Sequence, residues 1–167
     1  RDRENAVELW VADARTGSAK AIAGVRVNDV LGNPITWMND NVHLLVRAVP
    51  DGRGKAPEAP KVPIGPTVEE TSGKQSGTAT YQDLLKNSND ENLFEYYATL
   101  QLLNVNSQNG EASPIGRPAL YSAANFSPDE QYVLVTRIKR PFSYRVPYQA
   151  FTRSVEVLDP KGSVVKT

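Results

Sequence analysis

The segment from Arg137 to Arg153 has a composition that could bind an anion. It contains five basic residues, no acidic residue and four interleaved aromatic residues. The basic residues are Arg137, Lys139, Arg140, Arg145 and Arg153, and the aromatic residues are Phe142, Tyr144, Tyr148 and Phe151. Arginine offers a planar fork that matches a carboxylate, and basic residues mixed with aromatic ones can bind single-stranded nucleic acid. A structured loop that packs its aromatic side chains onto the protein is the third interpretation, and the segment by itself leaves all three open.

The rest of the chain carries no catalytic or metal-binding motif. The 167 residues contain no cysteine and one histidine, His43, which excludes thiol catalysis, cysteine-based zinc sites and multi-histidine metal sites. No nucleophile elbow, phosphate-binding loop or dinucleotide motif occurs. We expect His43 on a strand face, opposite Val42 and Leu44, without a general-base role. Acidic residues are expected at hairpin turns rather than in a catalytic pair: Asp13, Asp40, Asp129, Glu130 and Asp159. The sequence therefore assigns no catalytic residue, no metal and no cofactor.

Composition indicates a globular chain of one domain or part of one. Nineteen basic residues balance 19 acidic ones, so the net charge gives no general attraction to nucleic acid or to an anionic membrane. No stretch approaches the roughly 18 apolar residues needed to span a bilayer. The chain begins Arg1-Asp2-Arg3-Glu4 and ends in a strand-like run, and we interpret it as a piece of a longer polypeptide.

The elements that must position the basic segment are predicted to be β-strands. Short runs rich in branched and aromatic residues alternate with Gly, Asn, Asp and Pro clusters. We expect strands over Val7–Ala12, Lys20–Ile22, Val42–Val49, Tyr97–Leu103, Tyr132–Ile138 and Ser154–Leu158. One helix is expected over Tyr81–Lys86 with Thr80 as its N-cap, and a second short helix could form over Asn92–Tyr96.

Two units recur along the chain. The first is a strand followed by a turn that closes at a glycine, and it ends at Gly17, Gly110 and Gly162. The second is an aromatic residue, a polar turn and an apolar strand, over Thr36–Val46 and Asn125–Val135. Gly110 and Gly162 lie 52 residues apart, and the earlier interval is similar once an insertion of roughly 40 residues is subtracted. This period predicts an all-β fold, a partial β-propeller of about two and a half four-stranded blades.

The repeats are interrupted twice. An insertion over about 51–92 begins with a proline-rich part, Pro50–Pro66, which we expect to be extended. A polar stretch, Glu69–Ala79, is expected to be a mobile loop, and the predicted helix makes the insertion partly helical. The second excursion, over about 139–153, replaces a tight turn with the basic segment. We treat residues 1–167 as a fragment of a single propeller domain.

Several motifs resemble one peptidase family. Leu9–Gly17 and Trp37…Leu44–Val46 are similar to the amino-terminal propeller of the prolyl oligopeptidase family of serine peptidases. Within this family, the chain most resembles the subgroup of plastid glutamyl endopeptidases and their bacterial relatives. The similarity runs from Val7 to about Val165. The motifs that carry this similarity are Arg53–Pro57, Pro63–Pro66, Tyr81–Lys86, Leu93–Ala98, Arg140–Pro147 and Ser154–Val157.

The resemblance implies a non-catalytic segment of a two-domain hydrolase. The Ser-Asp-His triad would lie in an α/β-hydrolase domain that this chain lacks, and the propeller would restrict access to it and contact the substrate. Glutamyl-cleaving members need a cation near the residue before the scissile bond, so Arg140, Arg145 and Tyr144 are the candidate substrate-binding residues, and the proline-rich insertion could form part of a lid. The expected partners are the remainder of the polypeptide and peptide substrates, with no nucleic acid and no membrane, and a homo-oligomer is compatible with this.

Two further interpretations remain open at this stage. The chain could be a protein-interaction propeller or a nucleic-acid-binding module without enzymatic activity, although no repeat carries a Gly-His…Trp-Asp signature. An incomplete propeller should expose strand edges, so we expect the fragment to need the rest of its polypeptide for stability. The sequence does not assign a compartment; a bacterial periplasm or cytoplasm is favoured over a plastid stroma.

Overall fold

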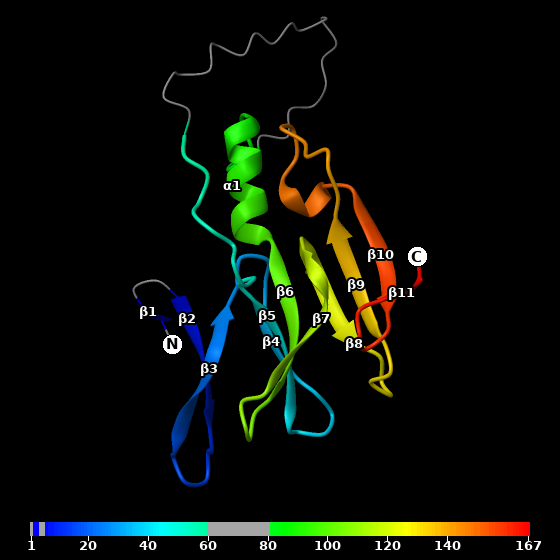
Figure 1. The fold of residues 1–167 in the computed structure, drawn as a ribbon. Helices are drawn as coiled ribbons and strands as arrows, with labels where there is room; N and C mark the ends of the chain where they lie inside the picture. Colours follow the sequence, from blue (N-terminus) through cyan, green and yellow to red (C-terminus); the bar gives the residue numbers. More distant parts are fainter. Residues whose placement is uncertain (1, 4–5, 60–80) are drawn as a thin grey trace, which may run out of the picture.

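The computed structural model describes residues 2–3, 6–59 and 81–167, and these form two antiparallel β-sheets and one α-helix (Figure 1). The first sheet contains β1 (Asp2–Arg3), β2 (Ala6–Ala12), β3 (Ala19–Val27), β4 (Ile35–Trp37), β5 (His43–Ala48), β6 (Leu100–Asn106) and β7 (Ala112–Ala119). The second sheet contains β8 (Tyr121–Phe126), β9 (Val133–Ile138), β10 (Arg153–Leu158) and β11 (Val164–Lys166). The predicted all-β class is confirmed, since α1 (Ser88–Ala98) and the short 3₁₀ helix η1 (Tyr148–Ala150) lie in connections between strands.

Three hairpins share the turn that the glycine-closed repeat predicts. β2 pairs with β3, β6 with β7 and β10 with β11, all antiparallel. Each closing glycine has a positive φ: 70° at Gly17, 80° at Gly110 and 84° at Gly162. A left-handed φ costs most residues energy but costs glycine little, so the same residue type recurs there. In each turn the glycine amide donates to the carbonyl of an Asp or Asn that lies at the end of the preceding strand or directly after it.

The second repeated unit also folds as a repeated hairpin. β4 pairs with β5 through a turn over 38–42, and β8 pairs with β9 through a turn over 127–132. Asn41 and Glu130 occupy matching positions with φ of 53° and 58°. Asp40 and Asp129 each accept a hydrogen bond from the backbone amide two residues later. The acidic residues at these corners therefore stabilise turns, as predicted.

The hydrophobic core lies between stacked layers of strands. Leu44 and Val46 of β5 pack with Leu9 and Ile22 of the β2–β3 hairpin. Leu45, which points to the opposite face, belongs to a second cluster that includes buried residues of the β8–β11 sheet. Alternate side chains of a strand point to opposite faces, so β5 is covered on both sides and lies in the central layer.

The described parts of the two long connections lie at the same end of the strands (Figure 1). Residues 49–99 link β5 to β6 and contain α1, and residues 139–152 link β9 to β10 and contain η1. A third apolar cluster joins these connections to the strands beneath; its buried members are Leu31, Ala98, Leu120, Ile138, Phe142 and Phe151. The tight turns of the repeated hairpins lie at the opposite end of the strands.

The helix predicted over Tyr81–Lys86 is wrong, and the alternative over Asn92–Tyr96 lies within α1. Asp83 has a φ of 57°, which an α-helix does not accommodate. The helix begins instead after Asn87, whose side chain accepts a hydrogen bond from the Asp90 amide at 2.9 Å. Because α1 extends to Ala98, β6 begins at Leu100 rather than at Tyr97. Thr80, Glu69–Ala79 and the prolines 60, 63 and 66 lie outside the described residues.

Candidate functional site

The basic connection between β9 and β10 lies against α1, and Arg140 makes the closest polar contacts between them. Its Nη1 lies 2.6 Å from Oε2 of Glu91, and its Nη2 lies 2.8 Å from Oε2 of Glu95. Its guanidinium also lies over the ring of Phe142, 4.6 Å from the centroid. The hydrogen bond to Glu95 is the largest of several effects that raise the pKa of Arg140. The charge of this predicted substrate-binding residue is therefore already matched within the chain.

Arg145 has a different environment. Its side chain is exposed, and in the described part of the chain its guanidinium has no ion-pair partner. Only its backbone is tied, since the Arg145 amide donates to Oγ of Ser143 at 3.1 Å. Arginine retains its charge at any physiological pH, so Arg145 presents an available cation on this connection.

Tyr144, the third candidate, lies between these two environments. It is 45% exposed, and a side-chain hydrogen bond with Glu91 is the main cause that raises its pKa. Tyr144 therefore lies near the Glu91 carboxylate of α1 and remains accessible to solvent. The structure thus brings Tyr144 and Arg140 together at Glu91 and leaves Arg145 without a carboxylate partner among the described residues.

The other basic residues of the segment are also engaged. Arg137 and Lys139 lie 3.1 Å and 3.5 Å from the carboxylate of Glu156, and Arg153 donates to the carbonyl of Gln149 at 2.6 Å. Four of the five basic side chains of this segment therefore have a hydrogen-bond or ion-pair partner within the protein. Arg145 is the exception among the described contacts.

Most aromatic side chains of the segment are packed inward. Phe142 and Phe151 are buried and stack on each other with centroids 5.4 Å apart, and Phe94 of α1 meets both edge-on. Tyr148 also packs against Phe94, at 6.1 Å. Single-stranded nucleic acid needs successive exposed rings on which bases stack. This connection exposes Tyr144 alone among its four aromatic residues, so its described residues do not present a series of rings for base stacking.

A cavity of about 300 Å³ opens beside this packed unit. It lies between the residues that precede α1 and the second half of the basic connection. Its walls combine apolar and polar side chains and consist of Gln82, Asp83, Leu84, Leu85, Phe94, Val146, Pro147, Tyr148, Gln149 and Phe151. Val146 follows Arg145 directly, so the unpaired guanidinium is attached next to one wall of this cavity.

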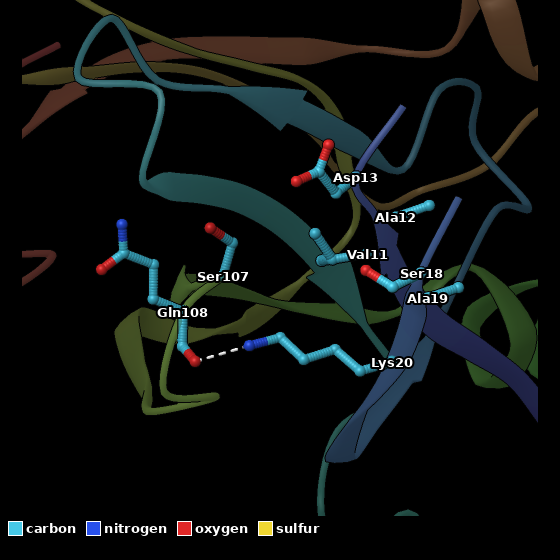
Figure 2. A pocket seen from close by; sticks show the side chains of 8 residues that line it. All are labelled: Val11, Ala12, Asp13, Ser18, Ala19, Lys20, Ser107 and Gln108. Atoms are coloured by element: carbon cyan, nitrogen blue, oxygen red, sulfur yellow. Dashed lines mark hydrogen bonds between the residues drawn. The ribbon is translucent and has the colours of Figure 1, made fainter. Parts of the chain in front are cut away.

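A larger, open cavity of about 560 Å³ lies at the opposite end, between the β2–β3 and β6–β7 turns (Figure 2). Lys20 crosses it and donates to the carbonyl of Gln108 at 2.6 Å, as Figure 2 shows. Its other charged lining residue, Asp13, caps its own turn by accepting from the Arg15 amide. The two charged groups are thus used locally, and the cavity contains no nucleophile paired with a base.

His43 lies on β5 and is fixed by its neighbours. Its Nδ1 lies 2.5 Å from Oδ2 of Asp40, and its Nε2 faces Nδ2 of Asn106 at 3.4 Å. A small polar cavity of about 200 Å³ adjoins it, lined also by Asn104, Glu111 and Ser113. Within residues 2–3, 6–59 and 81–167 no group of three potential metal ligands occurs. Among those same residues, α1 is too short to cross a bilayer.

The sequence did not reveal the two glutamates that bind Arg140. Glu91 and Glu95 precede Arg140 by 49 and 45 residues. Their spacing of four residues would have predicted that they share one face of a helix, if the helix had been located correctly.

Comparison with known proteins identifies related sequences. The chain is 38% identical over 165 residues, 96% of its length, to the probable chloroplastic glutamyl endopeptidase of Oryza sativa subsp. japonica. It is 38% identical over 163 residues to the protein of the same name from Arabidopsis thaliana. It spans 17% of the length of each relative. No family model and no solved structure matches. The chain is thus related in sequence to a segment of these peptidases, which confirms the resemblance inferred from its motifs.

Proposed function

We propose that this chain is a non-catalytic propeller segment of a serine peptidase of the prolyl oligopeptidase type. In this proposal it controls access to an α/β-hydrolase domain, elsewhere in the polypeptide, that carries the Ser-Asp-His triad. The observation that carries the proposal is the 38% identity to two proteins named probable glutamyl endopeptidase, over nearly the whole chain. Since that match covers 17% of each relative, the activity belongs to the longer protein and not to this segment alone.

The strand order supports the propeller. β4, β5, β6 and β7 pair in chain order as an antiparallel meander, and β8, β9, β10 and β11 do the same. The β2–β3 hairpin precedes them and matches the second half of each meander in its glycine-closed turn. Four-stranded antiparallel units that stack face to face are typical of propeller blades. The chain then contains two blades and the outer hairpin of a third.

The long connections support the gating role. In each four-stranded unit the excursion lies between the second and third strands, at residues 49–99 and 139–152. Equivalent positions in successive blades lie on the same face of a propeller. Both excursions would therefore extend from one face, where they could cover the opening to a catalytic domain.

Arg145 is the proposed cation for the carboxylate of a glutamyl substrate. Arg140 is also a candidate from the sequence, but two glutamates already match its charge. Arg145 is exposed, and a fork-shaped guanidinium can hold a carboxylate with two hydrogen bonds. Tyr144, exposed beside it, could add a hydroxyl contact to the same substrate.

The test uses the full-length protein and two peptides that differ only in Glu or Gln before the scissile bond. Arg145→Ala should lower kcat/KM for the Glu peptide about tenfold or more, because one charge-assisted contact is lost, and should affect the Gln peptide little. Arg15→Ala, at a hairpin turn on the opposite end, is the matched control. If the full-length protein hydrolyses neither peptide, the proposed peptidase function is rejected. If Arg145→Ala lowers kcat/KM equally for both peptides, Arg145 does not bind the substrate carboxylate.

A further inference from the structure

Arg140 connects two segments that are distant in sequence. It lies two residues beyond the end of β9, whereas Glu91 and Glu95 lie one turn apart on α1. Three hydrogen bonds join the guanidinium to the two carboxylates, at 2.6, 2.8 and 3.2 Å. We call these three residues the Arg140 cluster. The geometry uses both edges of the guanidinium, one for each carboxylate.

The Arg140 cluster covers an apolar contact. Directly beneath it Phe94 of α1 meets Phe142 edge-on at 5.2 Å, and Arg140 lies over the Phe142 ring. Glu91 is the most buried partner, with 16% of its side chain exposed, against 42% for Arg140. A single exposed ion pair contributes little, but a forked arginine held by two carboxylates over packed rings is a more specific contact.

A second set of contacts holds α1 from its other side. Arg53 lies over the Tyr96 ring at 4.6 Å, and the Tyr96 hydroxyl donates to the carbonyl of Gly54 at 2.8 Å. Near the end of the helix, the buried side chain of Asn28 donates to the carbonyl of Tyr97 at 2.9 Å. The helix is therefore fixed to the loop residues that follow β3 and β5, and residues 139–152 pack against a helix that is already held in place.

We propose that Arg140 is a positioning residue: the Arg140 cluster fixes residues 139–152 to α1, so that this connection and the helix form one unit that places Tyr144 and Arg145. Tyr144 is four residues beyond Arg140 in the same connection, and the nearby Glu91 carboxylate raises its pKa. The structural part of this inference stands on contacts alone, and its effect on hydrolysis rests on the proposed function. To bind the substrate directly, Arg140 would have to give up its bonds to Glu91 and Glu95 and pair with the substrate carboxylate instead.

The two roles predict different effects of the glutamates. If Arg140 positions the connection, the double variant Glu91→Gln/Glu95→Gln should reproduce Arg140→Gln, because both disrupt the same contact. Each should lower kcat/KM of the full-length enzyme for the Glu peptide about tenfold, the size expected for a misplaced binding group. Combining all three substitutions should add little further loss. Glu58→Gln, an exposed carboxylate on the same insertion, is the matched control.

Hydrogen exchange provides a readout that does not depend on activity. Both Arg140→Gln and the double glutamate variant should speed amide exchange in 139–152 and leave β5 and β6 protected. Arg140→Lys should have an intermediate effect on both measurements, since it keeps the charge and loses the fork.

Two outcomes would overturn the inference, and a third would reject the proposed function alone. Loss of activity in Arg140→Gln with normal activity in the double glutamate variant would assign Arg140 to the substrate. Unchanged exchange in both variants would show that the Arg140 cluster does not hold the connection. If the full-length protein hydrolyses neither peptide, the proposed function fails, and the exchange experiment still decides whether residues 139–152 and α1 form one unit.

Discussion

Gly162 lies directly against Gly116, and this contact joins the two sheets. The Gly116 amide donates to the carbonyl of Lys161 at 3.3 Å, and a Cβ added to Gly162 would overlap the backbone of Gly116. Gly116 belongs to β7, whereas Gly162 closes the β10–β11 turn. A glycine that the sequence assigns only to a turn is therefore also required where two layers meet.

We predict that Gly162→Ala destabilises the protein more than Gly17→Ala does. Both residues have a positive φ, at 84° and 70°, which costs an alanine roughly 1–2 kcal/mol. Gly17 has no atom within 4 Å of an added Cβ, so it shows the cost of φ alone. Thermal unfolding of the two variants measures the difference. Equal shifts would mean that the layers can separate at this point without cost.

Glu156→Gln should destabilise the protein by about 3–5 kcal/mol, the cost of breaking a buried ion pair. Glu156 is 5% exposed and pairs with Arg137, whose guanidinium also donates to the Tyr121 hydroxyl at 3.2 Å. Removing the carboxylate charge leaves Arg137 without compensation between the sheets. Glu111→Gln, on the surface, is the control, and chemical denaturation is the measurement. A change near zero would show that the exposed part of the Arg137 side chain is solvated well enough to replace the pairing with Glu156.

Asp40 should titrate well below an ordinary aspartate. A hydrogen bond from the His43 side chain, with further bonds from the His43 and Val42 amides, lowers its pKa from 3.8 to about 2. Because the folded pKa is lowered, this stabilisation is present above pH 3.8 and is lost as the pH falls through about 2. Asp40→Asn should therefore flatten the decline of stability between about pH 4 and pH 2, and Asp51→Asn, fully exposed, should not. An Asp40 carboxyl that titrates near 3.8 by NMR would contradict this.

The outer face of the β8–β11 sheet should be covered in the full-length protein. Leu134 and Val155 share this face and are 47% and 54% exposed, whereas Val133 and Val135 on the inner face are fully buried. In the proposed propeller the next blade packs there. Val155→Asp should then lower the thermal unfolding midpoint of the full-length protein, because it would bury a charge. Val30→Asp, in an exposed loop, is the control, and equal small effects would argue against a following blade.

The predicted turns and most strands were correct because their causes are local. An Asp or Asn that caps a turn and a glycine with positive φ act within five residues of each other, as Asp13 and Gly17 do. Alternation along β5 correctly placed His43 opposite Leu44. The helix over Tyr81–Lys86 was predicted from an N-cap at Thr80 and helical spacing, whereas Asn87 and Asp90 supplied the cap of the helix that forms. Where a helix begins depends on which of several possible capping residues makes its hydrogen bond. The sequence pattern did not show whether Thr80 or Asn87 would do so.

The sequence by itself determined that residues 137–153 form a basic, aromatic connection and that repeated hairpins support it. It could not determine which of those charges is available. That depended on the tertiary structure, which brings Glu91 and Glu95 to Arg140, Glu156 to Arg137 and Lys139, and leaves Arg145 exposed. The physical reason is range: turn and strand preferences arise between neighbours in the chain, whereas the pairing of a charge depends on groups that only folding brings within about 4 Å of it.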